Sequence, residues 1–467
     1  MCLTPPEEIR ERFMVRAMLL ATIVPLGVAA MSLVPPARLP APLSPADGVH
    51  TFTYDSVQRR LPLIVEAVIT NNPSYSAELV EDLRTFAAEI AAGKPISPLK
   101  STDGGWTDFL SPMIAGGSTW FTAPWWASEN YFYKRMLELT DPRTDLADPF
   151  AKQKTDSLAA AASAFERMLA QGLAETTDLA PLVLTSLWGN VADLSVSAGS
   201  VLVAPEDASS GSSLGSSMML ADDTPALCDA LHRCSGKPII VVLDNCGLEA
   251  VSDLLLVDGL LRIVRPSKVT LHVKDRPVFV SDVTIPDVQP TIDWLAGHGG
   301  AQVAARLSAA LADGSLQVSA PDFYTSALPF WSMPAALAEE FGAAALVLTK
   351  GDANYRRLLD DRHWAHDTRS VPSHHGLGPR QSLTPTGDGG RLASLSPSLP
   401  PVSCAQLWRA DELLAHEHRL AAHMQVRGAG GRRPGRRVGG QGGAPGELAD
   451  RRPLWYGPAS RGAVSEA

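Results

Sequence analysis

Residues 238–243 limit the possible folds of this chain more than any other segment. Their sequence, PIIVVL, is a short, continuous apolar run rich in β-branched residues. Such a run is typical of a strand buried on both faces, because a sheet with one wetted face alternates apolar and polar residues. Strands buried on both faces belong to sheets that carry helices on each side, and most of those sheets are parallel. The segment therefore predicts an α/β fold.

Strands and helices alternate after this run. Residues 269–273 and 345–348 have the composition of buried strands, and residues 278–280 are compatible with a third, short strand. Apolar residues recur at helical spacing in the intervening segments, around 248–261, 290–312 and 334–342. This alternation indicates a layered α/β domain with a mainly parallel sheet.

The chain before this domain is predicted to be largely helical. Residues 54–93 carry apolar stripes at helical spacing, and more helices are expected over 151–172 and 178–188. Aromatic residues recur at helical spacing around Pro124, which favours a structural core over a ligand site. We expect four regions: an N-terminal extension and Pro-rich lead-in (1–50), a helical cap region (51–180), the α/β core (181–369) and an irregular tail (370–467).

Charge and cysteine usage exclude some classes of partner and setting. The formal net charge of −10 and the pI of about 5.6 argue against nucleic acid as a partner, because phosphate backbones require basic surfaces. The five cysteines form no CxxC pair, so neither a disulfide framework nor a zinc ribbon is indicated. A reducing, intracellular setting fits this usage, and we expect a cytoplasmic protein.

The N-terminal residues allow two interpretations. Arg10, Arg12 and Arg16 precede an apolar stretch, 18–34, that resembles a signal peptide or a weak membrane anchor. Alternatively, the segment is an extension outside the working protein, and Met31 begins the natural chain. The second interpretation is favoured because nothing downstream looks secreted, so we expect no stable membrane association.

The C-terminal region changes character after about Ser370. Residues 370–403 are rich in Pro, Ser and Gly and lack periodicity, whereas residues 405–425 are predicted to be helical. Residues 426–446 are rich in Gly and Arg. This basic stretch is compatible with an RNA-binding arm, but its composition favours a disordered tail.

Three polar clusters directly follow the predicted buried strands. Asp244 and Asn245 come after the first strand, Asp282 follows residues 278–280, and Lys350 follows the strand at 345–348. In parallel α/β sheets, ligands bind outside the carboxyl ends of the strands. We therefore expect these side chains to meet at one edge of the sheet.

The residue types at this edge suit phosphate chemistry. Asp244, Asn245 and Asp282 offer hard oxygen ligands without thiolate or imidazole, which favours Mg²⁺ or Mn²⁺ over zinc. Such an ion can polarise a phosphoryl group and lower the pKa of a bound water. Lys350 can place a positive charge on a phosphate, and Asp352 can orient a sugar hydroxyl or a water. The structural alternative is that these residues cap helices or belong to ordinary turns.

Four ordered motifs resemble the damage-control sugar-phosphate phosphatase family. They are LWGN (187–190) followed by DLS (193–195), VVLDNCGLEAVSDLLLVDGLL (241–261), HVKDRPVFVSDVTIPD (272–287) and LVLTKGDANYRRLLDDRHW (346–364). The likeness also includes PWWASENYFYKR (124–135) and extends over about residues 50–365. It is greatest to the subgroup that acts on hexose phosphates, whose mammalian members were also described as protein-glutamate carboxyl methyltransferases.

The resemblance implies a three-layer α/β/α core, a helical N-terminal cap and a metal-dependent phosphatase activity. It implies that the metal, Mn²⁺ before Co²⁺, Ni²⁺ or Mg²⁺, is held by Asp244, Asn245 and Asp282, and that both aspartates are catalytic. The implied substrates are fructose 1-phosphate and fructose 6-phosphate, whose removal limits damage by these sugars. The implied substrate contacts are Asp244, Asn245, Lys350, Gly351, Asp352, Ala353 and Asn354. Asn190 and Asp193 belong to a family motif without an assigned role.

The sequence departs from the family pattern at two places. Val191 stands where the family has a basic residue, and the Arg-Thr-x-Lys motif that should follow the last motif is absent. The lysine of that motif helps to hold the phosphate in the family, so an inactive family member with an aberrant C-terminus is one alternative.

Two other enzyme mechanisms fit the sequence less well than the phosphatase. S-adenosylmethionine-dependent methylation of protein glutamates is an alternative, but no Gly-rich turn follows a predicted strand. A haloacid-dehalogenase mechanism requires Asp-x-Asp after the first strand, and Cys246 stands at the position of its second Asp. A metal-dependent phosphatase is therefore favoured.

Overall fold

The computed structural model describes residues 19–23, 39–100, 105–140, 148–189, 222–364, 369–370 and 379–380. All of these lie within one compact unit, Met1–His416. The predicted helix at 405–425, most of the Pro-rich tail, the Gly/Arg-rich tail, Asn190 and Asp193 lie outside the described residues.

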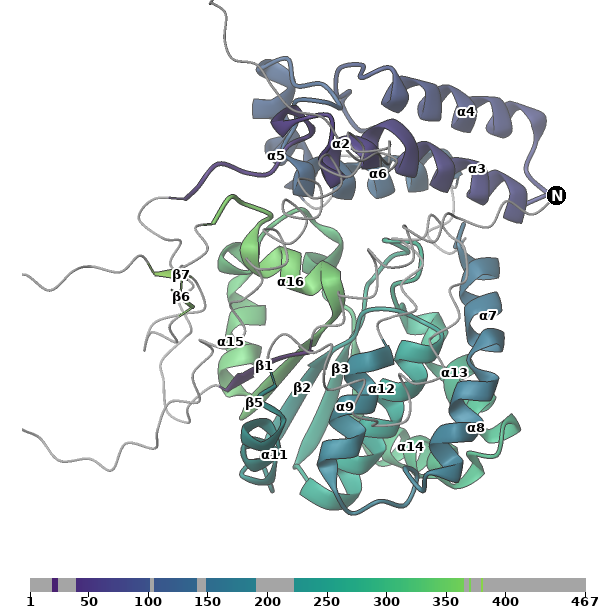
Figure 1. Cartoon of the computed structure of the whole chain (residues 1–467), viewed down its shortest axis with the longest axis vertical. Helices are drawn as coiled ribbons and strands as arrows, with labels where there is room; N and C mark the ends of the chain where they lie inside the picture. Colours follow the sequence, from purple (N-terminus) through teal and green to yellow (C-terminus); the bar gives the residue numbers. More distant parts are fainter. Residues whose placement is uncertain are drawn as a thin grey trace, which may run out of the picture. The chain divides into compact units, whose positions relative to one another are not determined.

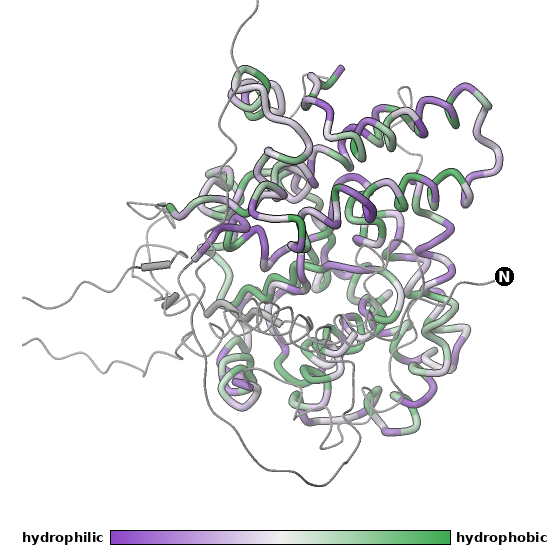
Figure 2. The backbone as a smooth tube through the Cα atoms, turned by 45° about the horizontal axis from the view of Figure 1, so that its top comes forward, coloured by the Kyte–Doolittle hydropathy of each residue, from purple (hydrophilic) through white to green (hydrophobic). Residues whose placement is uncertain are grey.

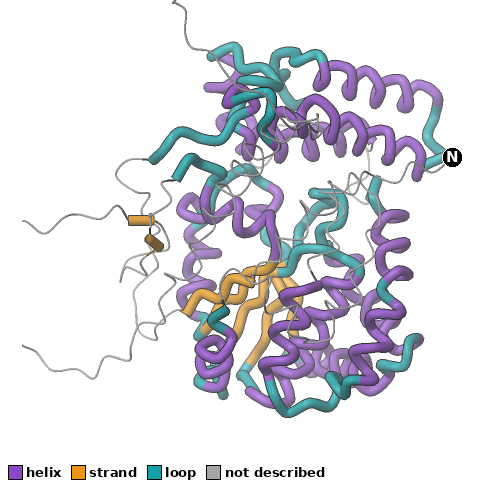
Figure 3. Tube along the Cα trace, in the orientation of Figure 1, coloured by secondary structure: helices purple, strands orange, loops and turns teal. Residues whose placement is uncertain are grey.

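The described residues include a five-stranded sheet with the strand order β1-β5-β2-β3-β4 (Figures 1 and 3). The run that constrains the fold is the middle strand, β2 (Pro238–Val242), which pairs in parallel with both neighbours. Those neighbours are β3 (Lys268–His272) and β5 (Leu346–Lys350), and β4 (Leu316–Ser319) continues the parallel order beyond β3. The mainly parallel sheet is therefore confirmed.

One edge strand comes from the N-terminal segment. Residues Leu19–Ile23 form β1, which pairs antiparallel with β5, so that Leu19 lies opposite Lys350. A strand in this segment was not expected from the sequence. No helix within the described ranges is long and apolar enough to cross a membrane.

Alternate residues of β2 enter two different hydrophobic cores, as expected for a strand covered on both faces. Ile239 and Val241 pack in the larger core, and Ile240 and Val242 pack in the smaller one. The smaller core contains α15 (Ala335–Ala343) and two short 3-10 helices, η6 (Asp322–Thr325) and η7 (Phe330–Ser332). The three-layer α/β/α core is confirmed.

The larger core is built around α12 (Leu248–Gly259), all of whose residues are buried. This helix packs most extensively on α9 (Leu179–Gly189). The other helical segments that contribute to this core are α8 (Ala162–Ala170), α11 (Thr224–His232), η5 (Leu260–Val264), α13 (Ile285–Gly297) and α14 (Ala301–Asp313). A helix that is surrounded on every side can carry polar residues only where other groups form hydrogen bonds or ion pairs with them. Polar residues of α12 find such partners near the carboxyl edge of the sheet.

The N-terminal region is helical, as predicted, and supplies most of a separate hydrophobic core. Its helix α3 (Leu61–Asn71) is mostly hydrophobic, whereas α4 (Ala77–Ala91) intersperses hydrophobic and hydrophilic residues along its length (Figure 2). The remaining elements are η1 (Pro45–Asp47), α2 (Phe52–Asp55), η2 (Ser56–Arg60), α5 (Trp106–Ala115) and α6 (Trp125–Thr140), with α7 (Ala151–Ala160) leading back to the sheet. The aromatic residues around Pro124 are buried core residues, as expected from their spacing.

A buried ionic cluster joins this region to the helix after β5, α16 (Gly351–Leu359). The carboxylate of Glu129 on α6 pairs with Arg60 and, at 2.6 Å, with Arg356 on α16. The guanidinium of Arg356 also lies 5.0 Å from the ring centroid of Trp126. Because a buried charge must be paired, this cluster fixes α16 against α6.

The expectation of a short strand at residues 278–280 is wrong. Phe279 and Val280 have φ angles of 49° and 66°, in the left-handed region that β-branched residues rarely adopt. The ring of Phe279 stacks on Trp126 at 5.8 Å and meets Tyr133 at 5.0 Å. The apolar side chains of this segment fill the core of the helical region instead of pairing with a strand, so composition alone misassigned it.

Two further strand assignments could not be made from composition. Strand β4 was missed because only its first residue, Leu316, is buried. A two-residue pair, β6 (Arg369–Ser370) with β7 (Pro379–Arg380), lies where the sequence predicts irregular structure.

Candidate functional site

Two loops meet at the carboxyl edge of the sheet. The loop after β2 carries Asp244 and Asn245, and the loop after β3 carries Asp282. Asn245 and Asp282 form an antiparallel bridge, and the Val283 amide donates to the Asp244 carbonyl at 2.7 Å. The structure thus brings the three residues of the sequence-predicted metal site together.

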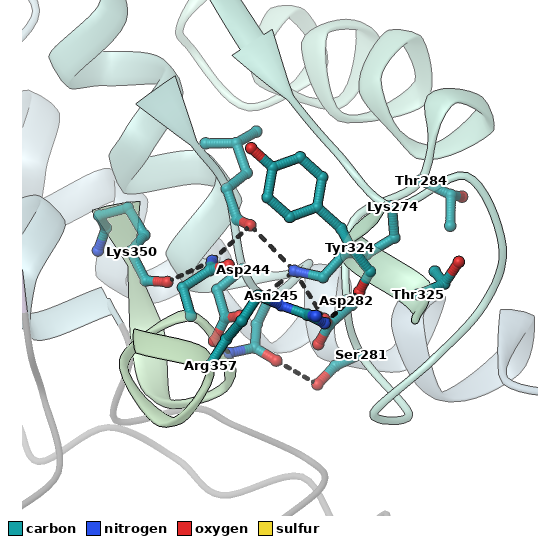
Figure 4. Close-up of polar contacts among 12 residues, drawn as sticks. Asp244, Asn245, Lys274, Ser281, Asp282, Thr284, Tyr324, Thr325, Lys350 and Arg357 are labelled. Atoms are coloured by element: carbon teal, nitrogen blue, oxygen red, sulfur yellow. Dashed lines mark hydrogen bonds and ion pairs between the residues drawn. The ribbon is translucent and has the colours of Figure 1, made fainter. Parts of the chain in front are cut away.

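The ammonium of Lys274 lies between the two carboxylates. Its Nζ atom is 3.0 Å from Asp282 Oδ2, 3.7 Å from Asp244 Oδ1 and 3.4 Å from the Leu243 carbonyl oxygen (Figure 4). All three charged side chains are about 1% exposed. Burial raises the pKa of Asp282, and the positive charge of Lys274 opposes that shift. One buried cation therefore interacts with both acids.

Lys274 was not among the residues singled out from the sequence. It follows β3 at the same place in the strand-end pattern as Asp244 and Asn245 after β2. The rule that the carboxyl ends of parallel strands line the site, applied to every strand, would have found it.

The side chain of Asn245 is oriented by hydrogen bonds on both of its polar atoms. Ser281 Oγ donates to Asn245 Oδ1 at 2.6 Å. Asn245 Nδ2 donates to Asp244 Oδ2 at 3.0 Å and to Glu249 Oε2 at 2.9 Å. Since the amide donates with Nδ2 toward carboxylates, its oxygen is left on the side of the Ser281–Asp282 turn.

Lys350 is directed away from the two aspartates. Its Nζ atom lies 2.6 Å from the Ser186 carbonyl oxygen, 3.1 Å from Glu249 Oε1 and 3.3 Å from Asp253 Oδ1. Burial favours the neutral form of Lys350 and would lower its pKa. The negative charges of Asp253 and Glu249 have the larger effect, so the pKa of Lys350 is raised. Burial also raises the pKa of Asp253 to about 7. The ammonium therefore compensates acids of α12 rather than facing the carboxylates at the strand ends.

The four residues after Lys350 occupy different surroundings. A Cβ atom on Gly351 would overlap the carboxylate of Asp244, and Gly351 has a φ angle of 76°. Asn354 Nδ2 donates to the Lys350 carbonyl at 2.8 Å and to the Leu243 carbonyl at 3.4 Å. Asp352 pairs with Arg356 at 3.6 Å, and Ala353 is buried in the core of the helical region. Gly351 and Asn354 are thus the members of this segment that contact the end of β2.

Two carboxylates and one amide oxygen are the donor set that a hard divalent cation prefers. Within the described ranges, no group of three or more His, Cys, Asp and Glu side chains is arranged to hold a metal ion, so the amide of Asn245 is an essential member of the candidate set. Asp244 and Asp282 together would balance the charge of such an ion. The residues therefore fit a divalent metal in type and in charge.

The fold and this cluster define an α/β protein with a buried carboxylate–amide site at the carboxyl edge of its sheet. The family model described as the damage-control phosphatase ARMT1-like domain matches residues 56–399, and the chain belongs to this family. The family is one of phosphatases, so the class of enzyme predicted from the motifs is confirmed. Family membership also indicates a divalent metal and a small phosphorylated substrate.

Relatives of this chain carry the same family name. The rat damage-control phosphatase ARMT1 is 29% identical over 394 residues, which cover 73% of this chain and 88% of the relative. The proteins of that name from Macaca fascicularis and from human are 30% and 29% identical over the same shares of each chain. Among solved structures, a DUF89 family protein from Pyrococcus horikoshii matches with a TM-score of 0.40 and 15% identity, covering 70% of this chain and 96% of that chain.

Proposed function

We propose that this chain hydrolyses phosphate monoesters of small sugars, fructose 1-phosphate and fructose 6-phosphate among them, at a metal site formed by Asp244, Asn245 and Asp282. One observation carries the proposal: two buried carboxylates and an oriented amide, from two separate loops, converge on the carboxyl edge of a parallel sheet. Hydrolysis of this kind would remove sugar phosphates that damage other molecules.

The metal is proposed to be Mn²⁺, with Co²⁺, Ni²⁺ or Mg²⁺ as substitutes. When bound, such an ion polarises the phosphoryl group and lowers the pKa of a coordinated water. The protein supplies the ligands and keeps them in place through Ser281 and Glu249, which hold the amide of Asn245. Groups that orient the ligands of a metal contribute to its affinity as the ligands do.

Lys274 is proposed to be the cation that faces the phosphoryl oxygens. Its ammonium is already beside Asp244 and Asp282, and a lysine there provides a positive charge of the kind that phosphate sites use. Lys350 is proposed to act indirectly. It holds Glu249, which in turn accepts a hydrogen bond from Asn245.

Two further contributions come from the segment after β5. Gly351 lets the backbone approach Asp244 without a clash, and Asn354 ties the segment to the end of β2. We propose that the segment Lys350–Asn354 contacts the substrate mainly through its backbone, and that Asp352 orients a hydroxyl or a water.

The proposed setting is a reducing one, and we propose a cytoplasmic enzyme. Cys228, Cys234 and Cys246, the cysteines within the described ranges, are free thiols. Methyl transfer from S-adenosylmethionine is not favoured, because β2 leads straight into Asp244 and only Gly247 provides a glycine before α12.

The test is phosphate release from fructose 1-phosphate by the full chain, with and without Mn²⁺. We expect Mn²⁺ to stimulate release, and Asp244→Ala and Asp282→Ala to abolish it. Asp293→Ala, which removes an exposed carboxylate on α13, is the control and should retain full activity. Full activity in either site variant would overturn the assignment, and no release by the unmodified chain would favour an inactive family member.

A further inference from the structure

A cavity of about 300 Å³ lies between α6, the loop after β3 and the segment that begins with η6. Its polar lining includes Asn130 and Lys134 from α6, Asp275 and Arg276 from the loop, and Asp322 and Thr325 from the third segment. The rings of Trp106, Tyr133 and Phe323 add apolar surface. Apolar walls with a few polar groups of both charges are typical of small-molecule sites.

Two chain segments connect this cavity to the candidate metal site. The loop after β3 has both ends in the carboxylate cluster, at Lys274 and Asp282, while its middle, 275–278, lines the cavity. On the other segment, the Tyr324 ring centroid lies 5.8 Å from Lys274 Nζ, and both sequence neighbours of Tyr324 line the cavity. The cavity is therefore adjacent to the site at which the phosphoryl group is proposed to bind.

The two segments are also tied to each other at the wall of the cavity. Thr325 Oγ1 donates a hydrogen bond to Asp275 Oδ1 at 2.5 Å. Tyr324 is itself fixed, because its hydroxyl lies 2.9 Å from His272 Nδ1 on β3. Polar groups held in this way are preorganised for a ligand.

A buried amide in the lining points to a missing hydrogen-bond partner. Asn130 is 1% exposed, and its Nδ2 atom donates to the Trp126 carbonyl at 2.7 Å. Its Oδ1 atom accepts no hydrogen bond from any residue that the structure describes. Since a buried acceptor without a partner is costly, a hydrogen-bond donor that reaches this atom would be favoured.

We propose that this cavity receives the hydroxyl-bearing carbon chain of the phosphorylated substrate, and that Asn130 selects it by accepting a hydrogen bond from a sugar hydroxyl. This inference rests on the proposed function and names the residue that distinguishes a sugar phosphate from a phosphate ester without hydroxyls. Asp275 and Asp322 accept from further hydroxyls, and the aromatic rings contact the C–H faces of the sugar. The cavity volume lies at the small end of the range for ligand pockets, which fits a single hexose.

The experiment compares two substrates in matched variants. Fructose 1-phosphate depends on the cavity, whereas p-nitrophenyl phosphate offers a phosphate but no hydroxyls. In Asn130→Leu, which keeps the size of the side chain and removes its acceptor, kcat/KM for fructose 1-phosphate should fall about tenfold, the equivalent of one hydrogen bond, mainly through KM. The value for p-nitrophenyl phosphate should change less than about twofold.

A second buried amide provides the matched control. Gln153 on α7 is 2% exposed, has no hydrogen-bond partner for its side chain among the described residues, and does not line the cavity. Gln153→Met should therefore leave both substrates unaffected. Leu137→Trp, which narrows the cavity with a larger side chain, is a second route to the same result if Asn130→Leu does not fold.

Each outcome decides the proposal. Equal losses with both substrates, or no loss with fructose 1-phosphate in Asn130→Leu and Leu137→Trp, would overturn it. If the unmodified chain hydrolyses neither substrate, the proposed function fails. The cavity is then tested by calorimetric titration with fructose 1-phosphate and with inorganic phosphate. Binding of the sugar phosphate that Asn130→Leu weakens would support the cavity, and absence of such binding would rule it out.

Discussion

Gly351 packs so closely on Asp244 that a Cβ atom at residue 351 would occupy the position of the carboxylate. The two residues come from the ends of neighbouring parallel strands, β5 and β2. Gly351 also has a φ angle of 76°, which glycine adopts without strain. Residue 351 must therefore be glycine for two reasons. Its backbone has a positive φ angle, and the carboxylate of Asp244, a candidate metal ligand, leaves no space for a side chain.

Gly351→Ala should destabilise the protein and weaken metal binding. Overpacking against Asp244 is expected to lower the free energy of unfolding by about 1–3 kcal/mol beyond the backbone strain. Gly314→Ala is the matched control, because Gly314 has a φ angle of 81° but an added Cβ atom would lie 3.9 Å from its nearest neighbour, the side chain of Gln317. Urea unfolding measures both variants, and equal losses would show that the contact with Asp244 has no energetic consequence.

Lys274→Met should make the protein more dependent on metal. Without its ammonium, the buried carboxylates of Asp244 and Asp282 lose their compensating charge, and the metal-free protein should lose about 3–5 kcal/mol of stability. Saturating Mn²⁺ should then raise the thermal unfolding midpoint more in the variant than in the unmodified chain, because binding to the folded state alone stabilises it.

A surface pair offers the control for that measurement. Lys152→Met breaks an exposed ion pair with Asp156 and should change the midpoint little, with or without Mn²⁺. An Mn²⁺-induced shift in Lys274→Met no larger than that of the unmodified chain would contradict the role assigned to Lys274.

Lys350→Met should lower the stability of the protein, rather than only weaken the binding of substrate. The substitution leaves Glu249 and Asp253 buried without their cation, at an expected cost of about 3–5 kcal/mol in the free energy of unfolding, measured without substrate. Adding Asp253→Asn should restore part of the loss, because the remaining acid then has less repulsion to overcome. A stable variant with only a raised KM would instead indicate that Lys350 contacts the phosphate.

The contribution of His272 to the stability of the protein should fall as the pH drops below about 6.5. Burial lowers the pKa of His272, so the folded state keeps this ring neutral while the unfolded state binds a proton. Because the unfolded state then binds more protons at this ring, the contribution of the ring to the free energy of unfolding rises with pH across this range. The stability gained by keeping His272 neutral is complete above the pKa of this ring in the unfolded state, and it is lost as the pH falls below that value.

His272→Gln should flatten this dependence. The difference in unfolding free energy between pH 5.5 and pH 7.5, from urea titrations, should be smaller in the variant by up to about 1.4 kcal/mol for each unit by which the pKa is displaced. His232→Gln removes an exposed ring and serves as the reference. If the free energy of unfolding changes with pH to the same extent in both variants, His272 does not contribute to the pH dependence of stability.

The positions of Asp244, Asn245 and Asp282 could be predicted because each follows a strand-like apolar run. The prediction needed only the rule that parallel strands end at one edge. It succeeded for Asp282 although the segment before it is a turn, because the loop after β3 returns Asp282 to a backbone bridge with Asn245. Asn130 could not be found in this way, since the cavity it lines is formed by segments that are distant in sequence.

The sequence by itself determined the elements whose signal is local: the buried strand β2, the alternation of strands and helices, and the polar residues at the strand ends. Only the tertiary structure decided which lysine faces the aspartates. Lys274 and Lys350 both lie at strand ends, but the acids of α12 draw the ammonium of Lys350 away, while Lys274 meets Asp244 and Asp282. The direction of a buried charge depends on the groups packed around it, and those groups come from elements that no local pattern brings together.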